Sequence, residues 1–171
     1  MLITSTDRNR GFSLIEVLIA LFVLAIGLLG MATLMMNSMQ SSQGASQRSA
    51  ATVAAYDLIE RMRVNRNEAI KASSDYASDP ATADSDCNPK EDAGCSAEKM
   101  VVYDLDTWWT SLQLAIPDAE VTIQQDPAGA GDDVYCIVIF WQEPGVEPTN
   151  VASPCGTLAA TRAFYTMQVT L

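Results

Sequence analysis

One uninterrupted apolar stretch near the N-terminus limits what this chain can fold into. Residues 12–36 read FSLIEVLIALFVLAIGLLGMATLMM, and Glu16 is their only charged residue. About 18 or more apolar residues in a row are typical of a membrane-spanning helix, and at about 1.5 Å per residue this stretch reaches roughly 38 Å. The rest of the chain is more polar and strongly acidic. We therefore expect one membrane anchor followed by one soluble domain.

Charge and cysteine content indicate where each part of the chain lies. Arg8 and Arg10 precede the apolar stretch, and such residues favour the cytoplasmic side of a membrane helix. The part after residue 36 would then face a bacterial periplasm, and an even count of 4 cysteines suits that oxidising compartment. The net charge is −11 with no basic stripe, so no nucleic-acid partner is expected.

The pattern after the apolar stretch predicts an α+β domain that begins with the end of a long helix. This helix should run from residue 12 to about 67, and Tyr56 should lie in the core under the sheet. One buried face of the helix is made by Ala51, Ala55, Leu58, Ile59 and Met62. Residues 73–99 are rich in Ser, Asp, Ala and Pro and predict a loop. A short helix capped by Asp104 or Asp106 should follow and end at Pro117. Its buried face is expected to contain Trp109, Leu112 and Ile116.

Apolar and polar residues alternate with a period of two, which predicts a small antiparallel sheet between about residue 119 and residue 171. Val121 and Ile123 alternate with polar residues, and a strongly apolar run follows at 134–141. At the C-terminus one face would carry Tyr165, Met167, Val169 and Leu171. We expect three strands.

The junction before the apolar stretch, R-G-F-S-L-I-E-V-L at residues 10–18, is unlike an ordinary secretory signal. Such a signal has its small-residue cleavage site after the apolar core, whereas here the glycine and the arginines come before it. Glu16 is also unusual, because a carboxylate near a bilayer centre costs about 2.5–3.5 kcal/mol and needs a partner. As the first-turn acid of a plain anchor helix, Glu16 would be favoured by the helix dipole, but that interpretation leaves the Arg10–Gly11–Phe12 junction unexplained.

These residues resemble the class III signal of type IV prepilins. The resemblance implies a type IV pilin-like fold, cleavage by a prepilin peptidase between Gly11 and Phe12, and methylation of Phe12. It also implies that Glu16 guides assembly by pairing with the N-terminal amine of a neighbouring subunit. Residues 1–11 would be the leader, 12–36 the half-helix that spans the inner membrane and later lies in the filament core, and 37–171 the periplasmic head. Many major pilins carry a proline where this chain has Thr33.

Beyond the signal, the chain is similar to the minor pilins of the type IV pilus modification protein (PilV) family. The similar segments are I-G-L-L-G-M at 26–31, A-Y-D-L-I-E-R-M-R-x-N at 55–65, W-x-x-x-L-x-x-x-I-P at 108–117, V-I-F-W-Q-E at 138–143 and F-Y-T-M-Q-V-T-L at 164–171. This similarity implies a subunit that helps to initiate pilus assembly near the tip. Its partners would be other minor pilins, the major pilin, the inner-membrane assembly platform and a tip adhesin, and its final location the pilus on the cell surface.

The cysteines allow three connectivities, of which local pairing of Cys87 with Cys95 and of Cys136 with Cys155 is the simplest. The second disulfide would connect the strand around Cys136 to the loop that follows it, as C-terminal disulfides do in pilins. Neither pair has the spacing usual for zinc. Acidic residues in the predicted loop do not match a calcium-binding pattern and indicate a solvated loop: Asp79, Asp84, Asp86, Glu91 and Asp92. No metal and no cofactor is expected.

Two other classes of protein remain as alternatives. A minor pseudopilin of a type II secretion system would share the leader, Glu16 and the long helix, although pseudopilins often lack disulfides. A membrane-tethered periplasmic enzyme or binding module is the second alternative. The chain has no histidine and no G-x-S-x-G nucleophile motif, so the sequence does not favour an enzyme.

Overall fold

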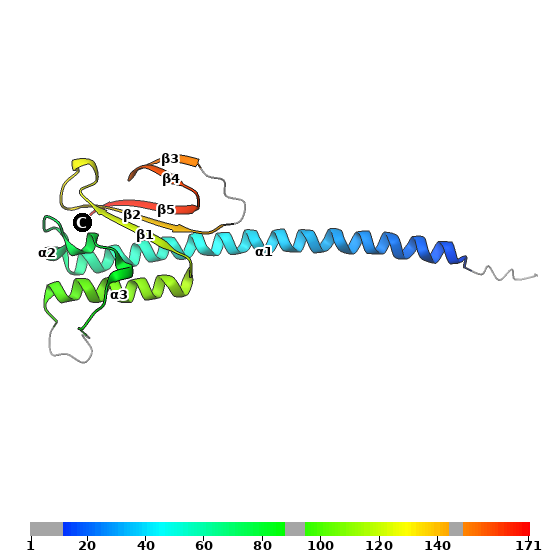
Figure 1. The fold of residues 1–171 in the computed structure, drawn as a ribbon, viewed down its shortest axis with the longest axis horizontal. Helices are drawn as coiled ribbons and strands as arrows, with labels where there is room; N and C mark the ends of the chain where they lie inside the picture. Colours follow the sequence, from blue (N-terminus) through cyan, green and yellow to red (C-terminus); the bar gives the residue numbers. More distant parts are fainter. Residues whose placement is uncertain (1–11, 88–94, 144–148) are drawn as a thin grey trace, which may run out of the picture. The chain divides into compact units, whose positions relative to one another are not determined.

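The computed structural model describes residues 12–87, 95–143 and 149–171, which fall into two units divided after Ser42. Helix α1 (Leu14–Val64) contributes to both units (Figure 1). The described part of the first unit consists of residues 12–42. The second unit, residues 43–171, contains the rest of α1 and every other element, and we call it the head. The α+β class predicted from the sequence is confirmed.

The connection between the two long helices of the head is more ordered than the sequence predicts. The long helix ends at Val64, and a single turn, α2 (Arg66–Ala69), follows it. Two 3₁₀ turns, η1 (Asp75–Ala77) and η2 (Pro80–Thr82), lie inside the predicted loop. Ser74 and Asp79 cap these turns with their side chains. Short polar side chains that accept backbone N–H bonds explain why a segment of loop-like composition forms turns here.

Helix α3 (Ala97–Ala115) is longer than predicted and has a different cap. Its N-terminus is capped by Ser96, whose hydroxyl accepts a 3.2 Å hydrogen bond from the backbone N–H of Lys99. Asp104 and Asp106, expected as caps, lie inside the helix. The prediction failed because Ser96 lies in a stretch of polar and small residues that carries no apolar periodicity. The predicted end was correct, since the last helical residue precedes Ile116 and Pro117.

The main sheet has three antiparallel strands in the order β1–β2–β5. Strands β1 (Glu120–Gln125) and β5 (Ala163–Thr170) flank β2 (Val134–Trp141). Ile123 lies opposite Ile137, and Ile137 lies opposite Met167, which fixes the register across the sheet. A second sheet that the sequence did not predict is the hairpin of β3 (Thr149–Ser153) and β4 (Gly156–Ala160).

Strand β2 is buried on both of its faces, which explains its almost continuous apolar sequence. Its odd-numbered residues Tyr135, Ile137, Ile139 and Trp141 belong to the main core. Cys136 and Val138 are buried as well and point to the opposite face of the strand. Cys136 is bonded there to Cys155, which lies in the β3–β4 turn.

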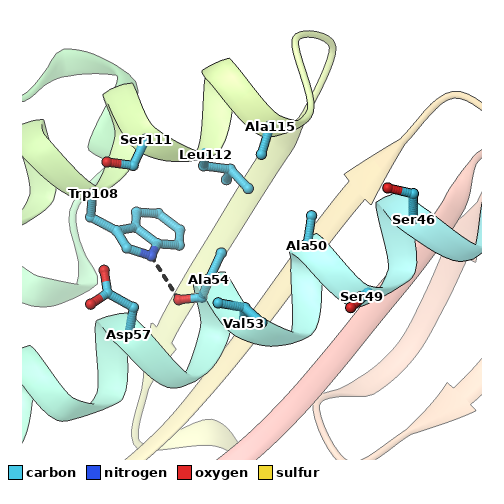
Figure 2. A pocket seen from close by; sticks show the side chains of 10 residues that line it. All are labelled: Ser46, Ser49, Ala50, Val53, Ala54, Asp57, Trp108, Ser111, Leu112 and Ala115. Carbon is cyan, nitrogen blue, oxygen red and sulfur yellow. Dashed lines mark hydrogen bonds between the residues drawn. The ribbon is translucent and has the colours of Figure 1, made fainter.

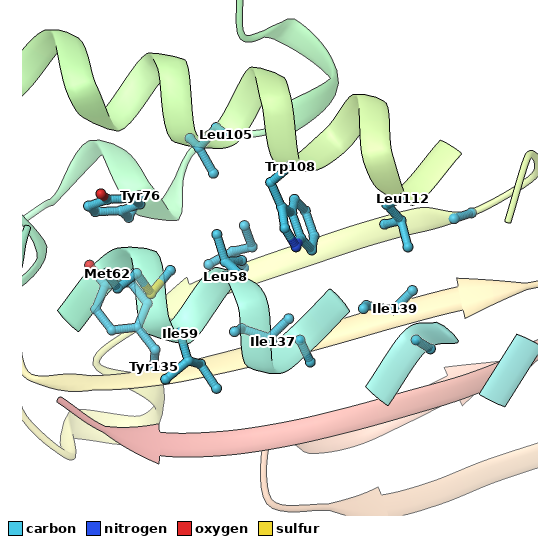
Figure 3. Close-up of a cluster of buried hydrophobic side chains, with 14 of the residues drawn as sticks. Leu58, Ile59, Met62, Tyr76, Leu105, Trp108, Leu112, Tyr135, Ile137 and Ile139 are labelled. Carbon is cyan, nitrogen blue, oxygen red and sulfur yellow. The ribbon is translucent and has the colours of Figure 1, made fainter. Parts of the chain in front are cut away.

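The main core lies where α1 and α3 meet the three-stranded sheet (Figure 3). The predicted face of α1 is confirmed, because all five of its residues are buried: Ala51, Ala55, Leu58, Ile59 and Met62. Tyr56 is 52% exposed, so its predicted place in the core was wrong. Trp108 is buried and the neighbouring Trp109 only partly so, which reverses the predicted order on α3. The predicted inner face of β5 packs against the core as expected.

Candidate processing and anchoring site

The N-terminal part of α1 presents apolar side chains on all sides. Every described residue from Phe12 to Gln43 is exposed. Among the described residues, α1 is the one helix long and apolar enough to cross a membrane, judged by length and composition. A helix that is apolar all round needs an apolar environment, which lipid or other apolar helices can supply. Membrane anchoring is therefore supported by the structure of this segment.

Glu16 lies in the first turn of this apolar helix and is exposed. Its backbone N–H donates a 3.0 Å hydrogen bond to the carbonyl of Ser13. Phe12, the residue predicted to follow the cut, is 84% exposed. Gly11, the residue predicted to precede the cut, lies outside the described residues, as do Arg8 and Arg10. The structure thus puts Phe12 and Glu16 at the same end of the apolar helix, about one helical turn apart.

Comparison with protein families gives two matches on adjacent parts of the chain. The prokaryotic N-terminal methylation motif matches residues 6–32. The model described as type IV pilin Tt1218 matches residues 33–106. The chain is similar to type IV pilins over residues 6–106. No curated protein and no solved structure matches the chain significantly.

The matches agree with the architecture of this pilin-like chain. The methylation motif covers the predicted junction, Glu16 and most of the apolar helix. The second match continues along α1 into the head and ends within α3. A long apolar N-terminal helix followed by a small antiparallel sheet is consistent with the type IV pilin fold. These findings support a structural subunit that contacts other pilins and the pilus assembly machinery.

A partly buried polar network that the sequence did not indicate joins α1, α3 and η1 in the head. The guanidinium of Arg61 contacts Asp57 at 3.0 Å, the hydroxyl of Thr107 at 2.8 Å and Asp104 at 3.5 Å. Asp104 also accepts a 2.6 Å hydrogen bond from the hydroxyl of Tyr76. Burial, together with this hydrogen bond, raises the pKa of Tyr76 above its ordinary value of 10.0. The arrangement links three segments of the head.

A groove lies between α1 and the C-terminal half of α3, and the charged residue in its lining is Asp57 (Figure 2). Its volume is about 610 Å³. Small side chains line much of it, and the indole of Trp108 forms part of its wall. The indole Nε1 donates a 2.7 Å hydrogen bond to the carbonyl of Ala54. The polar part of its lining consists of Asp57 and three serines, Ser46, Ser49 and Ser111.

Two disulfides cross-link segments of the head. Cys87 is bonded to Cys95, with their Cα atoms 6.0 Å apart, and Cys136 to Cys155, with their Cα atoms 5.5 Å apart. These are the local pairings that the sequence favoured. The second bond connects the central strand of the main sheet to the β3–β4 turn. The hydroxyl of Thr166 in β5 lies 2.9 Å from the sulfur of Cys155.

Two of the acidic residues predicted to lie in a solvated loop serve as a cap and as an ion-pair partner. Asp79 accepts a 3.0 Å hydrogen bond from the N–H of Ala81, and Asp86 lies 3.0 Å from the ammonium of Lys99. Glu91 and Asp92 lie outside the described residues. Within the described ranges, no group of three or more His, Cys, Asp or Glu side chains could hold a metal ion.

Proposed function

We propose that this chain is a minor pilin that helps to initiate type IV pilus assembly. A prepilin peptidase cuts between Gly11 and Phe12 and methylates the new amine of Phe12. Before the cut, residues 12–36 hold the subunit in the inner membrane with the head in the periplasm. The observation that carries the proposal is the methylation motif over residues 6–32, which coincides with an exposed apolar helix.

Glu16 gives the processed subunit a means of registering with its neighbours. A carboxylate at an apolar helix end is costly unless a cation pairs with it, and cleavage creates a new cation at Phe12. In our proposal the amine of one subunit pairs with Glu16 of the adjacent subunit as the apolar helices leave the lipid. An unpaired Glu16 is costly in the apolar core, so subunits prefer the one axial offset at which Glu16 and the amine can pair.

Two features of the chain support a minor rather than a major subunit. Thr33 occupies the position where many major pilins carry proline, and its hydroxyl donates a 3.0 Å hydrogen bond to the carbonyl of Leu29. The helix is thus continuous through Thr33 and keeps the backbone donor that a proline would remove. The second feature is the set of segments similar to the PilV family. Such a subunit would act with other minor pilins near the tip, where it presents an adhesin.

Intact-mass measurement tests the processing step directly. The membrane-extracted chain, expressed with and without prepilin peptidase, should lose residues 1–11 and gain one methyl group only when the peptidase is present. An uncut mass, or a cut after the apolar segment, would overturn the proposal. Glu16→Gln keeps the size of the side chain and removes its charge, so we expect normal processing with failed assembly. Ser13→Ala, just before the helix, is the control and should process and assemble normally.

The location of the processed subunit separates a pilus from a type II secretion filament. Sheared pili from cells that carry the native chain should contain it in small amounts relative to the major pilin. Deletion of the chain should lower the number of surface pili and leave protein secretion unchanged. The opposite result, normal piliation with lost secretion, would assign the chain to a secretion system as a minor pseudopilin.

A further inference from the structure

Gly44 is the first buried residue of α1 in the described chain, and a carboxylate from the sheet side of the head lies against it. A Cβ built at Gly44 would come within 2.6 Å of Oε1 of Glu143, which follows the end of β2. Glycine is a poor residue inside a helix because it gains no side-chain contacts and loses much backbone freedom. A side chain at this position would therefore have to displace the carboxylate of Glu143.

Arg48, one turn further along α1, holds this carboxylate. Its Nη2 atom donates to both oxygens of Glu143, at 3.2 Å and 3.1 Å. The side chain of Glu143 is 19% exposed, whereas that of Arg48 is 64% exposed. Glu143 therefore depends on Arg48 to compensate the loss of hydration, while the Arg48 end of the pair remains open to dissolved ions.

Around this ion pair, α1 buries only small side chains. Its buried residues up to position 55 are Gly44, Ala51 and Ala55, and the large ones, Leu58, Ile59 and Met62, come afterwards. Hydrophobic stabilisation scales with the apolar area buried, so the early part of this interface contributes much less than the later part. Residues 41–49 read SSQGASQRS, and serine and glycine are weak helix formers.

We propose that the Arg48–Glu143 ion pair is a releasable latch that keeps residues 44–50 of α1 helical and packed on the sheet. When the latch opens, these residues separate from the sheet and fray. The side chains from Leu58 onward stay packed, and the hydrogen bond from Trp108 to the carbonyl of Ala54 holds the helix beyond the fraying segment. The head keeps its fold because its large core residues lie on the far side of that bond.

Hydrogen–deuterium exchange of the full chain in detergent micelles, read by peptide mass spectrometry, tests the latch. Glu143→Gln keeps the shape of the side chain and removes its charge. We expect exchange in residues 44–50 to become about fivefold faster, with residues 58–62 and β2 unchanged. The matched control is Glu60→Gln, which breaks the Arg63–Glu60 pair within the same helix. Unchanged exchange in 44–50, an equal increase across the head, or the same effect from Glu60→Gln would overturn the proposal.

A substitution at Gly44 shows whether the ion pair or the intrinsic helix propensity controls exchange in residues 44–50. Gly44→Ala improves the intrinsic helix propensity but displaces Glu143, so we expect faster exchange in residues 44–50. Gly30→Ala is the control, because nothing lies within 4 Å of a Cβ built there. Slower exchange in 44–50 for Gly44→Ala would show that propensity, and not the latch, controls this segment. Salt dependence is a third test. Raising the salt concentration should accelerate exchange in residues 44–50 of the native chain and have less effect in Glu143→Gln. Equal effects in the two proteins would contradict the latch.

Discussion

The hydroxyl of Tyr76 in η1 donates a 2.6 Å hydrogen bond to Oδ2 of Asp104 in the middle of α3, and both side chains are buried. This bond joins a single 3₁₀ turn to a long helix across 28 residues of sequence. It also gives the buried carboxylate a second donor beside Arg61, which lies 3.5 Å away. A buried carboxylate with two donors stabilises the contact between the connection and α3, whereas one that loses a donor destabilises it.

Removing that hydroxyl should destabilise the head. Tyr76→Phe leaves Asp104 buried with the distant guanidinium of Arg61, and we expect the free energy of unfolding to fall by about 1–3 kcal/mol. Denaturant unfolding of the full chain in detergent, followed by tryptophan fluorescence, measures this change. Tyr56→Phe removes the same group from an exposed position on α1 and should change stability by less than about 0.5 kcal/mol. Equal effects of the two substitutions would contradict this role of Tyr76.

Stability should fall in alkali because two buried tyrosines resist deprotonation in the folded head. Burial raises the pKa of Tyr76 and that of Tyr135 above the ordinary value of 10.0. Between that value and the folded pKa, the unfolded chain releases protons that the folded chain keeps, so unfolding becomes more favourable as the pH rises. The free energy of unfolding should therefore be constant with respect to these groups below about pH 10 and decrease above it.

The Tyr76→Phe variant provides the check on this alkaline effect. Unfolding free energies measured at several pH values from about 9 to 11 should decrease less steeply in the variant than in the native chain. The remaining slope should shrink further in a variant that also carries Tyr135→Phe. If the native chain and both variants show the same slope, the buried tyrosines do not cause the loss.

The two disulfides should contribute differently to the head. Cys136→Ala with Cys155→Ala opens a longer loop than Cys87→Ala with Cys95→Ala, since the separations are 19 and 8 residues. We expect losses of about 3 and about 2.5 kcal/mol, respectively, from loop entropy. The first pair of substitutions also releases the β3–β4 hairpin, whose strands pair only with each other in the described sheets.

Limited proteolysis distinguishes the local effect of that first disulfide from a general loss of stability. Without the Cys136–Cys155 bond, cleavage within residues 149–160 should become faster at denaturant-free conditions, whereas loss of the Cys87–Cys95 bond should leave cleavage there unchanged. Equal protection of the hairpin in both variants would mean that non-covalent contacts hold it to the main sheet.

The adjacent tryptophans of α3 should respond very differently to substitution. Trp108→Phe removes the donor to the carbonyl of Ala54 and leaves space in a buried position, so we expect a loss of about 1–3 kcal/mol. Trp109→Phe alters a side chain that is only partly buried and should cost less than about 1 kcal/mol. Thermal unfolding followed by circular dichroism compares them. A larger loss for Trp109→Phe would contradict the observed burial of the two side chains.

The long helix and its buried face were predictable from the sequence because both depend on periodicity within one element. Residues 12–36 have the length and composition of an anchor, and Leu58, Ile59 and Met62 recur with the helical period. The strands β2 and β5 were predictable for the same reason, since alternation or a continuous apolar run determines which faces are buried. Tyr56 misled the prediction because an aromatic residue beside a helical face can pack inward or remain exposed.

Sequence reasoning was enough to predict the apolar anchor, the Gly11–Phe12–Glu16 pattern, the helical face and the inner strands, because each depends on residues close together in the chain. Tertiary structure alone decided that Tyr76 and Arg61 meet at Asp104, that Trp108 rather than Trp109 is buried, and that Glu143 lies on Gly44. The residues of these contacts come from segments far apart in the chain. Their pairing depends on how the helices and the sheet pack, which no local pattern encodes.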